Sequence, residues 1–145
     1  MKEISAGGVV YRLVEDRIEI QLIQDRYGQI TLAKGKMEQG ETIRQTALRE
    51  IEEETGLTGR IDRKLEVIQY QYEKDGTTID KEVHYYLVEA LKGEHTPQLE
   101  EIQSVQWHAP DKAWELQCEQ GYDNNDRVLK KALTYLMPSK TTLAR

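Results

Sequence analysis

The stretch AKGKMEQGETIRQTALREIEEETGL, residues 33–57, constrains the fold more than any other part of the chain. Apolar residues recur at helical spacing between Ile43 and Ile51, which predicts an amphipathic helix over 42–55. Gly56 follows directly and predicts the end of that helix, because glycine is the usual residue just past a helix C-terminus. The whole stretch is therefore predicted to form a loop, a helix and a second loop.

Glutamates crowd the second half of this helix, where Glu50, Glu52, Glu53 and Glu54 lie almost in a row. Like charges three or four positions apart repel each other and cost stability. At about 100° per residue, Glu50, Glu53 and Glu54 fall within roughly one third of the helical wheel, and Glu52 points elsewhere. This acidic face is either solvated surface or a cation site. Hard divalent ions such as Mg²⁺ prefer carboxylate oxygen and keep water and phosphate as further ligands.

Basic residues next to the acidic face favour a phosphate substrate. Arg49 could orient a carboxylate through bidentate hydrogen bonds. Lys34 and Lys36 precede the helix and could reach phosphate oxygens, although surface charge explains them as well. Gly35 lies between these lysines and would let the loop turn sharply against the helix. A divalent metal neutralises phosphate charge and lowers the pKa of a bound water, so this combination predicts hydrolysis of a phosphate anhydride.

Length and composition bound the remaining possibilities. The chain has 145 residues, which suits one domain, predicted over 1–138 with a flexible tail over 139–145. The net charge of −6 disfavours broad binding to nucleic acid. Cys118 is the only cysteine, so an intramolecular disulfide is excluded and a reducing compartment is expected. No signal-peptide core and no apolar run of about 20 residues occur, so the expected location is the cytoplasm, with no membrane partner.

The remaining elements are predicted from hydrophobic patterns and turn residues. The loop before the helix is expected to cover 26–40 and to be functional, because long structureless loops usually are. Gly7-Gly8 in the first strand predicts a bulge or the close approach of a ligand to the backbone. Strands before and after one helix, followed by further helices, predict a mixed-sheet α/β sandwich. The expected strands cover 4–14, 18–25, 63–74, 77–91 and 104–109, and the later helices cover 110–116 and 123–136.

The acidic helix and the loops beside it resemble the Nudix (MutT-type) hydrolase family. The family box has the pattern G-x5-E-x7-R-E-U-x-E-E-x-G-U, in which U is an aliphatic residue. SAGGVVY, residues 5–11, is also similar to the opening strand of many Nudix domains. Every fixed position of the box is filled here, by Gly35, Glu41, Arg49, Glu50, Ile51, Glu53, Glu54, Gly56 and Leu57.

This resemblance implies a Nudix α/β/α sandwich with a mixed β-sheet and a loop–helix–loop catalytic motif. The implied reaction is hydrolysis of a nucleoside diphosphate linked to another moiety, with Mg²⁺ or Mn²⁺ as cofactor and a small nucleotide as partner. Glu53, or a carboxylate outside the box, would help to deprotonate the attacking water. The implied metal site consists of Glu50, Glu53 and Glu54 together with Gly35. Arg49 would orient this cluster, and Glu41 and Gly56 would hold the motif in shape.

Other segments resemble diadenosine polyphosphate hydrolases in particular. AKGK, residues 33–36, is similar to the P-K-G-H segment of those enzymes, and 81–90 and 97–113 resemble their corresponding stretches. The resemblance implies that Lys34 contacts the phosphate chain and that Tyr85 stacks on an adenine. It also implies that Glu101 supplies a carboxylate outside the box. The residues alone leave Tyr85 equally open as a core aromatic and Glu101 as a solvated loop residue.

Departures from the P-K-G-H pattern concern the substrate and spare the metal-binding glutamates. Ala33 replaces the proline and Lys36 replaces the histidine. Lys36 adds positive charge near the phosphates, so it is the candidate specificity residue for a longer or more anionic chain. The alternatives left open are removal of pyrophosphate from an RNA 5′ end, hydrolysis of nucleoside triphosphates or ADP-ribose, and a catalytically silent domain that binds nucleotide.

Overall fold

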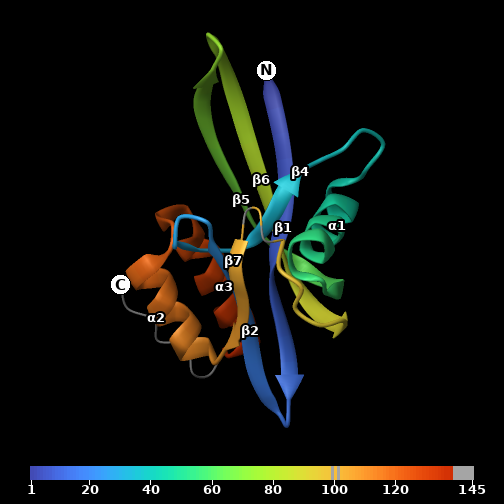
Figure 1. Cartoon of the computed structure of the whole chain (residues 1–145), viewed down its shortest axis with the longest axis vertical. Coiled ribbons are helices and arrows are strands. Elements are labelled where there is room, and N and C mark those ends of the chain that lie inside the picture. The colour runs from blue at the N-terminus through green and yellow to red at the C-terminus, as the bar shows by residue number, and fades with distance from the viewer. Residues whose placement is uncertain (99, 101, 139–145) are drawn as a thin grey trace.

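The computed structural model describes residues 1–98, 100 and 102–138. Within these residues one seven-stranded mixed sheet has the order β3-β2-β1-β6-β5, with β4 paired to β1 and β7 paired to β2. Helix α1 covers one face of this sheet, and α2 and α3 cover the other (Figure 1). The predicted α/β sandwich is confirmed, and the predicted tail, 139–145, lies outside the described residues. The strands are β1 (Lys2–Val14), β2 (Arg17–Asp25), β3 (Ile30–Thr31), β4 (Ala33–Lys36), β5 (Thr58–Lys74), β6 (Thr77–Lys92) and β7 (Ile102–His108).

Strand β1 is the centre of the sheet because three other strands pair with it. Its first half pairs antiparallel with β4, its last four residues pair antiparallel with β2, and most of its length pairs parallel with β6. A side chain at Gly7 would collide with the backbone of β4, and one at Gly8 would meet the Tyr86 carbonyl of β6. The predicted bulge is absent here, since residues 5–8 stay in register with β4. The close approach is made by protein backbone and not by a ligand.

The segment 26–40, predicted as a long loop, contains two short strands. β3 pairs with β2, and β4 pairs with β1. Ile30, Leu32 and Ala33 are buried in this segment, so it contributes to the core instead of lying on the surface. Strands of two and four residues are too short to show an alternating pattern, which is why the sequence did not reveal them. The correction matters because β4 carries Lys34 and Gly35.

Helix α1 (Ile43–Thr55) begins and ends as predicted. Thr42 forms a capping box: its hydroxyl accepts from the Gln45 backbone amide at 3.1 Å, and the Gln45 side chain accepts from the Thr42 amide at 2.9 Å. Gly56 takes a left-handed conformation with φ of 85° and donates its backbone N–H to the Glu52 carbonyl at 2.8 Å. Ala47 and Ile51 are fully buried under the sheet, so the opposite, charged side of the helix is free to face other segments.

The C-terminal elements differ from prediction mainly at their ends. β5 begins at Thr58, well before the expected start, and α2 (Pro110–Gln120) continues beyond the expected end. The helix predicted from Asp123 begins with a 3-10 turn, η1 (Asp123–Asn125), and α3 (Asp126–Leu136) follows it. Both α2 and α3 bury their apolar sides against the face of the sheet that lies opposite α1. Within the described residues, no helix has the length and apolar character needed to cross a membrane.

Candidate active site

Arg49 joins the loop before α1 to the acidic face of the helix. Its Nε and Nη2 donate to the two carboxylate oxygens of Glu41 at 2.5 and 3.0 Å. Its Nη1 donates to Glu50 at 2.8 Å and to Glu53 at 3.0 Å, and Nη2 also donates to the Lys36 carbonyl at 2.9 Å. Bidentate pairing of this kind fixes both the distance and the orientation of the two groups. Arg49 therefore holds the β4 end, the loop and two helix carboxylates in one arrangement.

Glu41 is the main partner of Arg49 and also binds the loop and the helix start. It accepts from the Glu38 backbone amide at 2.9 Å and from the Thr46 hydroxyl at 2.9 Å. The Arg49 guanidinium lowers the pKa of Glu41 to about 2, because hydrogen bonds to the charged carboxylate favour that form. The same contact raises the pKa of Arg49. Both groups therefore stay charged across the physiological range.

Glu50 lies against the backbone of β4. A side chain at position 35 would collide with the Glu50 carboxylate, so only glycine allows this close approach. Burial raises the pKa of Glu50, and the hydrogen bond from Arg49 opposes that shift. The Gly35 backbone and a carboxylate oxygen are thus held next to each other between the sheet and α1.

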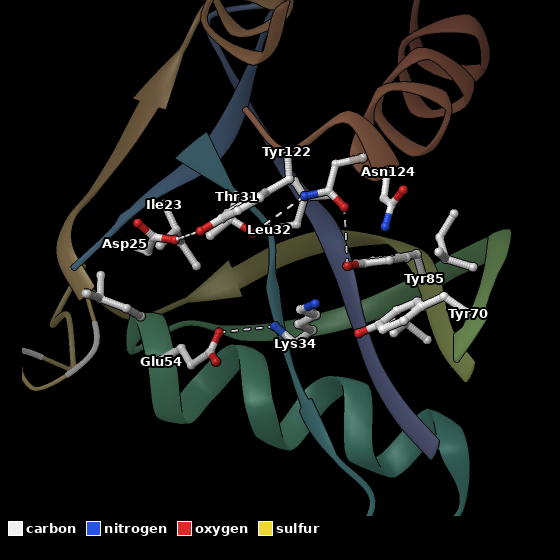
Figure 2. A pocket seen from close by; sticks show the side chains of 14 residues that line it. Ile23, Asp25, Thr31, Leu32, Lys34, Glu54, Tyr70, Tyr85, Tyr122 and Asn124 are labelled. Carbon is white, nitrogen blue, oxygen red and sulfur yellow. Dashed lines mark hydrogen bonds between the residues drawn. The ribbon is translucent and has the colours of Figure 1, made fainter. Parts of the chain in front are cut away.

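Glu54 and Lys34 meet where the acidic face reaches a cavity. The Lys34 backbone amide donates to a Glu54 carboxylate oxygen at 3.1 Å, and the Lys34 side chain points into the cavity (Figure 2). Burial lowers the pKa of the Lys34 ammonium, the nearby charge of Lys81 lowers it further, and Glu54 opposes both effects. A cation and an anion are therefore presented together at one edge of the cavity.

The cavity has a volume of about 520 Å³ and is enclosed by segments that are far apart in the sequence. The Tyr122 hydroxyl donates to Asp25 at 2.5 Å and links the loop before η1 to the end of β2 (Figure 2). That contact raises the pKa of Tyr122 to about 12. The lining residues are Ile23, Asp25, Thr31, Leu32, Lys34, Glu54, Ile68, Tyr70, Val83, Tyr85, Ile102, Tyr122, Asn124 and Asn125. An acidic helix face, a lysine and an aromatic cavity thus share one opening.

Residues 2–132 match the family model of the NUDIX domain. The chain belongs to the Nudix family. The predicted family is confirmed, and the acidic face of α1 lies within the box pattern, residues 35–57. The fold agrees with this assignment: the Caenorhabditis elegans Ap4A hydrolase, solved as a binary complex, superposes with a TM-score of 0.72 at 27% identity. That comparison covers 94% of this chain and 98% of the other.

Two curated relatives are similar in sequence. The putative mutator protein MutT4 of Mycobacterium tuberculosis is 38% identical over 112 residues, which cover 72% of this chain and 45% of that protein. The 8-oxo-(d)GTP phosphatase of Mycolicibacterium smegmatis is 30% identical over 149 residues, which cover 96% of this chain and 44% of that protein. This Nudix chain therefore spans less than half the length of both relatives.

Nudix hydrolases generally use divalent metals, and the donor chemistry here suits such an ion. Glu50, Glu53 and Glu54 offer hard carboxylate oxygens, and the absence of a side chain at Gly35 leaves a cradle beside Glu50. In the part of the chain that the structure describes, no three acidic, histidine or cysteine side chains are close enough together to hold a metal. The reason is visible in the contacts: Arg49 binds Glu50 and Glu53, whereas Glu54 faces Lys34.

Tyr85 lies at the cavity but is almost completely buried. Only 1% of its surface is exposed, its hydroxyl donates to Asn125 at 3.4 Å, and burial raises its pKa. A base could therefore reach the hydroxyl edge of Tyr85 but not a ring face. The more exposed rings of the cavity belong to Tyr70, at 40%, and Tyr122, at 37%. Neither tyrosine was predicted from the sequence, nor were Asp25, Asn124 and Asn125, because no local spacing connects these residues.

The three other predicted residues, Lys36, Glu53 and Glu101, have different outcomes. The Lys36 side chain is 62% exposed, pairs with Glu3 at 3.4 Å and does not line the cavity. Glu101 lies outside the described residues. Glu53 is bound by Arg49 and is otherwise open to solvent on the exposed side of α1. The structure thus brings Lys34, Glu54 and Tyr85 to one cavity and leaves Lys36 at its border.

Proposed function

We propose that this Nudix chain hydrolyses a phosphoanhydride bond of a nucleoside diphosphate-linked compound, and that its substrate is a dinucleoside polyphosphate. One observation carries the proposal: the acidic face of α1 and the aromatic cavity meet where Glu54 and Lys34 lie side by side. A substrate with a base in the cavity would place its phosphates next to Lys34 and the box glutamates. Similarity to the Ap4A hydrolase structure, at 27% identity over nearly the whole chain, supports the dinucleoside class.

The box residues would divide the work as follows. Glu50, Glu53 and Glu54, with the Gly35 backbone, would hold Mg²⁺ or Mn²⁺. A bound divalent metal neutralises phosphate charge and lowers the pKa of a coordinated water. Glu53 would accept the proton of the attacking water, with Glu101 as the alternative base.

Two further side chains would position these groups and the substrate. Arg49 would keep the carboxylates in place, since it already binds Glu50 and Glu53. Lys34 would contact a phosphate oxygen, because its ammonium points into the cavity (Figure 2). A partly buried cation interacts with phosphate more strongly than a fully solvated one, since water screens it less.

The base would bind in the aromatic part of the cavity. Tyr70 and Tyr122 offer exposed rings, and stacking of a base on an aromatic side chain contributes about 1–3 kcal/mol. Tyr85 would contribute its hydroxyl and not a ring face, which revises the stacking role expected from the sequence. Asn124 lies near Tyr85 and Tyr122 in the cavity wall (Figure 2). Asn125 also lines the cavity, and both side chains could hydrogen-bond to the base edge.

A purine nucleoside triphosphate, including an oxidised one, is the second candidate substrate. It is favoured by the polar groups of the cavity, because Asp25 supplies acceptors while Asn124 and Asn125 supply both donors and acceptors. The relative named 8-oxo-(d)GTP phosphatase, which aligns with 96% of this chain, supports the same candidate. An RNA 5′ end is a weaker candidate, since the net charge of −6 provides no broad basic surface. ADP-ribose stays an alternative, because a small ligand needs no such surface.

The deciding experiment is product analysis by chromatography with purified protein and Mg²⁺. The panel contains diadenosine tri-, tetra- and pentaphosphate, dGTP, 8-oxo-dGTP, ADP-ribose and 5′-triphosphate RNA, with Glu54→Gln as the inactive control. Reaction in ¹⁸O-labelled water, followed by mass spectrometry, identifies the phosphorus that is attacked. Preferred turnover of the diadenosine compounds supports the proposal, and preferred turnover of 8-oxo-dGTP selects the second candidate. Nucleotide binding without turnover of any compound would contradict both.

A further inference from the structure

Glu3 gathers three side chains at the border of the cavity. Its carboxylate accepts from Lys81 Nζ at 2.6 Å and from the Tyr72 hydroxyl at 2.9 Å, and it pairs with Lys36 Nζ at 3.4 Å. Tyr70, which lines the cavity, is the cross-strand partner of Lys81 in the β5–β6 pair. Glu3 also raises the pKa of Tyr70 through its charge, so the carboxylate lies within electrostatic reach of the cavity wall.

Two lysines, Lys36 and Lys81, contact this carboxylate, and Lys34 lies two residues before Lys36 on β4. The three lysines differ in what they bind. Lys81 has only 8% of its side chain exposed and is held by Glu3 and by the Ser5 hydroxyl at 2.6 Å. Among the described residues, Glu3 is the one ion-pair partner of Lys36, whose side chain is exposed to solvent. Lys34 points into the cavity, close enough to Lys81 for that charge to lower its pKa. The Glu3 carboxylate thus forms ion pairs with two of these three lysines, Lys36 and Lys81.

We propose that Glu3 limits the length of the phosphate chain that the protein binds. Because it engages Lys36 and Lys81, Lys34 is the lysine that remains directed at the cavity, and the Glu3 charge repels phosphates that extend past it. The proposal rests on the polyphosphate substrate argued above and names a residue outside the Nudix box as a specificity determinant.

Glu3→Gln is the variant that isolates this effect. Glutamine has the same shape and keeps an oxygen that can accept from Lys81, so the buried ammonium retains both partners. The negative charge disappears, and the exposed Lys36 becomes available for phosphate. A phosphate chain too short to extend past Lys34 gains little affinity from this change. A longer phosphate chain gains the attraction of Lys36 and is no longer repelled by Glu3.

The chain offers a matched control in Glu82→Gln. Glu82 lies on β6 next to Lys81 but points to the α1 side of the sheet, where it pairs with Lys2 at 3.0 Å and with His84 at 3.1 Å. Its replacement makes the same change in net charge close to Glu3, but on the opposite face. A general effect of net charge on anion binding would therefore appear equally in both variants.

The test is calorimetric titration of the whole chain with inorganic pyrophosphate and tetrapolyphosphate, in EDTA and at low ionic strength. We expect Glu3→Gln to bind tetrapolyphosphate about fivefold more tightly than the wild type, the size of one exposed ion pair gained. Pyrophosphate affinity should change less than about twofold, as should both affinities in Glu82→Gln. Equal gains for both ligands, equal gains in both variants, or no measurable binding would overturn the proposal.

A double-mutant cycle with Lys36→Gln separates specificity from structure. If Lys36 is released to bind phosphate, then Lys36→Gln should abolish most of the gain made by Glu3→Gln. A purely structural role would lower the melting temperature and shift the affinity of both phosphates together, which would also count against the proposal. Kinetics on diadenosine compounds form a separate arm: their failure would reject the proposed substrate, while the inorganic titration still decides the role of Glu3.

Discussion

The acidic face of α1 and the cavity beside it are built in different ways. The acidic face and its supporting loop come from one segment, 38–54, in which Arg49 binds Glu41, Glu50 and Glu53. The cavity is assembled from β2, β3, β4, β5, β6, β7, the end of α1, η1 and the residue before it, and its Tyr122–Asp25 bond joins residues 97 positions apart. In the proposed hydrolysis, one local motif would therefore carry the chemistry, whereas the choice of substrate would depend on the whole sheet.

The two regions also differ in the interactions that stabilise them. The acidic face is held by charge-assisted hydrogen bonds on the helix surface, so its residues can change without disturbing the core. The cavity residues Tyr85 and Val83 are also core residues, so changes there affect binding and stability together. Variants at the two regions should consequently separate into losses of turnover and losses of affinity.

The largest expected effect is at the acidic face. Glu54→Gln should reduce kcat by about 100-fold or more, because a carboxylate of the proposed metal site is replaced by a neutral amide. Thermal unfolding should change little, since Glu54 lies outside the two buried clusters. Glu52→Gln is the control: that residue is exposed on the same helix, and its variant should keep the wild-type rate. If both variants were equally active, the acidic face would not be the catalytic region.

The next effect concerns the cavity. Tyr70→Ala and Tyr122→Ala should each raise KM about tenfold, the loss of one base–aromatic contact, and leave kcat within about twofold. Tyr70→Phe keeps the ring and serves as the control, with KM near the wild-type value, whereas Tyr122→Phe keeps the ring but removes the bond to Asp25 and so tests that bond. Steady-state kinetics on the preferred substrate measure both constants. A fall in kcat at unchanged KM would show that the two regions do not divide binding from chemistry.

Gly56 sits at the end of the helix that carries the acidic face, and it should matter through stability. Gly56→Ala must place a side chain at φ of 85° and against the Thr96 hydroxyl and the Glu94 carbonyl. We expect a loss of about 2–3 kcal/mol in the free energy of unfolding, from strain and collision together. Gly76→Ala has φ of 77° and open space around it, so it measures strain alone, at about 1 kcal/mol. Equal losses in denaturant titrations would mean that the contact with 94–96 is unimportant.

The smallest effect is a dependence of stability on pH. The pKa of Glu41 is lowered from 4.5 to about 2 in the folded protein, chiefly by the Arg49 hydrogen bond. A lowered folded pKa contributes stability above the unfolded value, and that contribution is lost as the pH falls from about 4.5 towards 2. Glu41→Gln should therefore flatten the acid side of a plot of melting temperature against pH. A variant curve parallel to the wild-type curve through this window would contradict the assignment.

The success of prediction from the sequence differs between the same two regions, the local acidic face and the cavity. Helix α1 was predictable because its apolar face and its terminal glycine are local signals, and the box pattern led to the family. β3 and β4 were missed because strands of two and four residues carry no period. The sequence did not decide whether Tyr85 is a core residue or a ligand contact, since an aromatic residue among aliphatic ones suits a core and a binding site equally.

Most of the cavity was beyond prediction for a geometric reason. Asp25 and Tyr122 follow or precede ordinary turns, and nothing near either residue indicates that a hydroxyl and a carboxylate meet across the cavity. Glu3 and Lys81 are a second example, because their contact depends on the parallel pairing of β1 with β6. Contacts of this range are fixed by the topology of the sheet and not by any spacing in the sequence.

The three-way pairing of β1 has a consequence for motion. Amides of Val9 and Val10, inside fully buried positions of the central strand, should exchange with solvent deuterium only on global unfolding. The loop at 121–125, which forms the opposite wall of the cavity, is joined to β2 through the Tyr122–Asp25 bond and to β3 through a bridge from Gly121 to Ile30. Asn125 adds hydrogen bonds to Tyr85 of β6 and Thr31 of β3. These are side-chain contacts and one bridge and not a strand ladder, so the amides of this loop should exchange faster than those of the central strand.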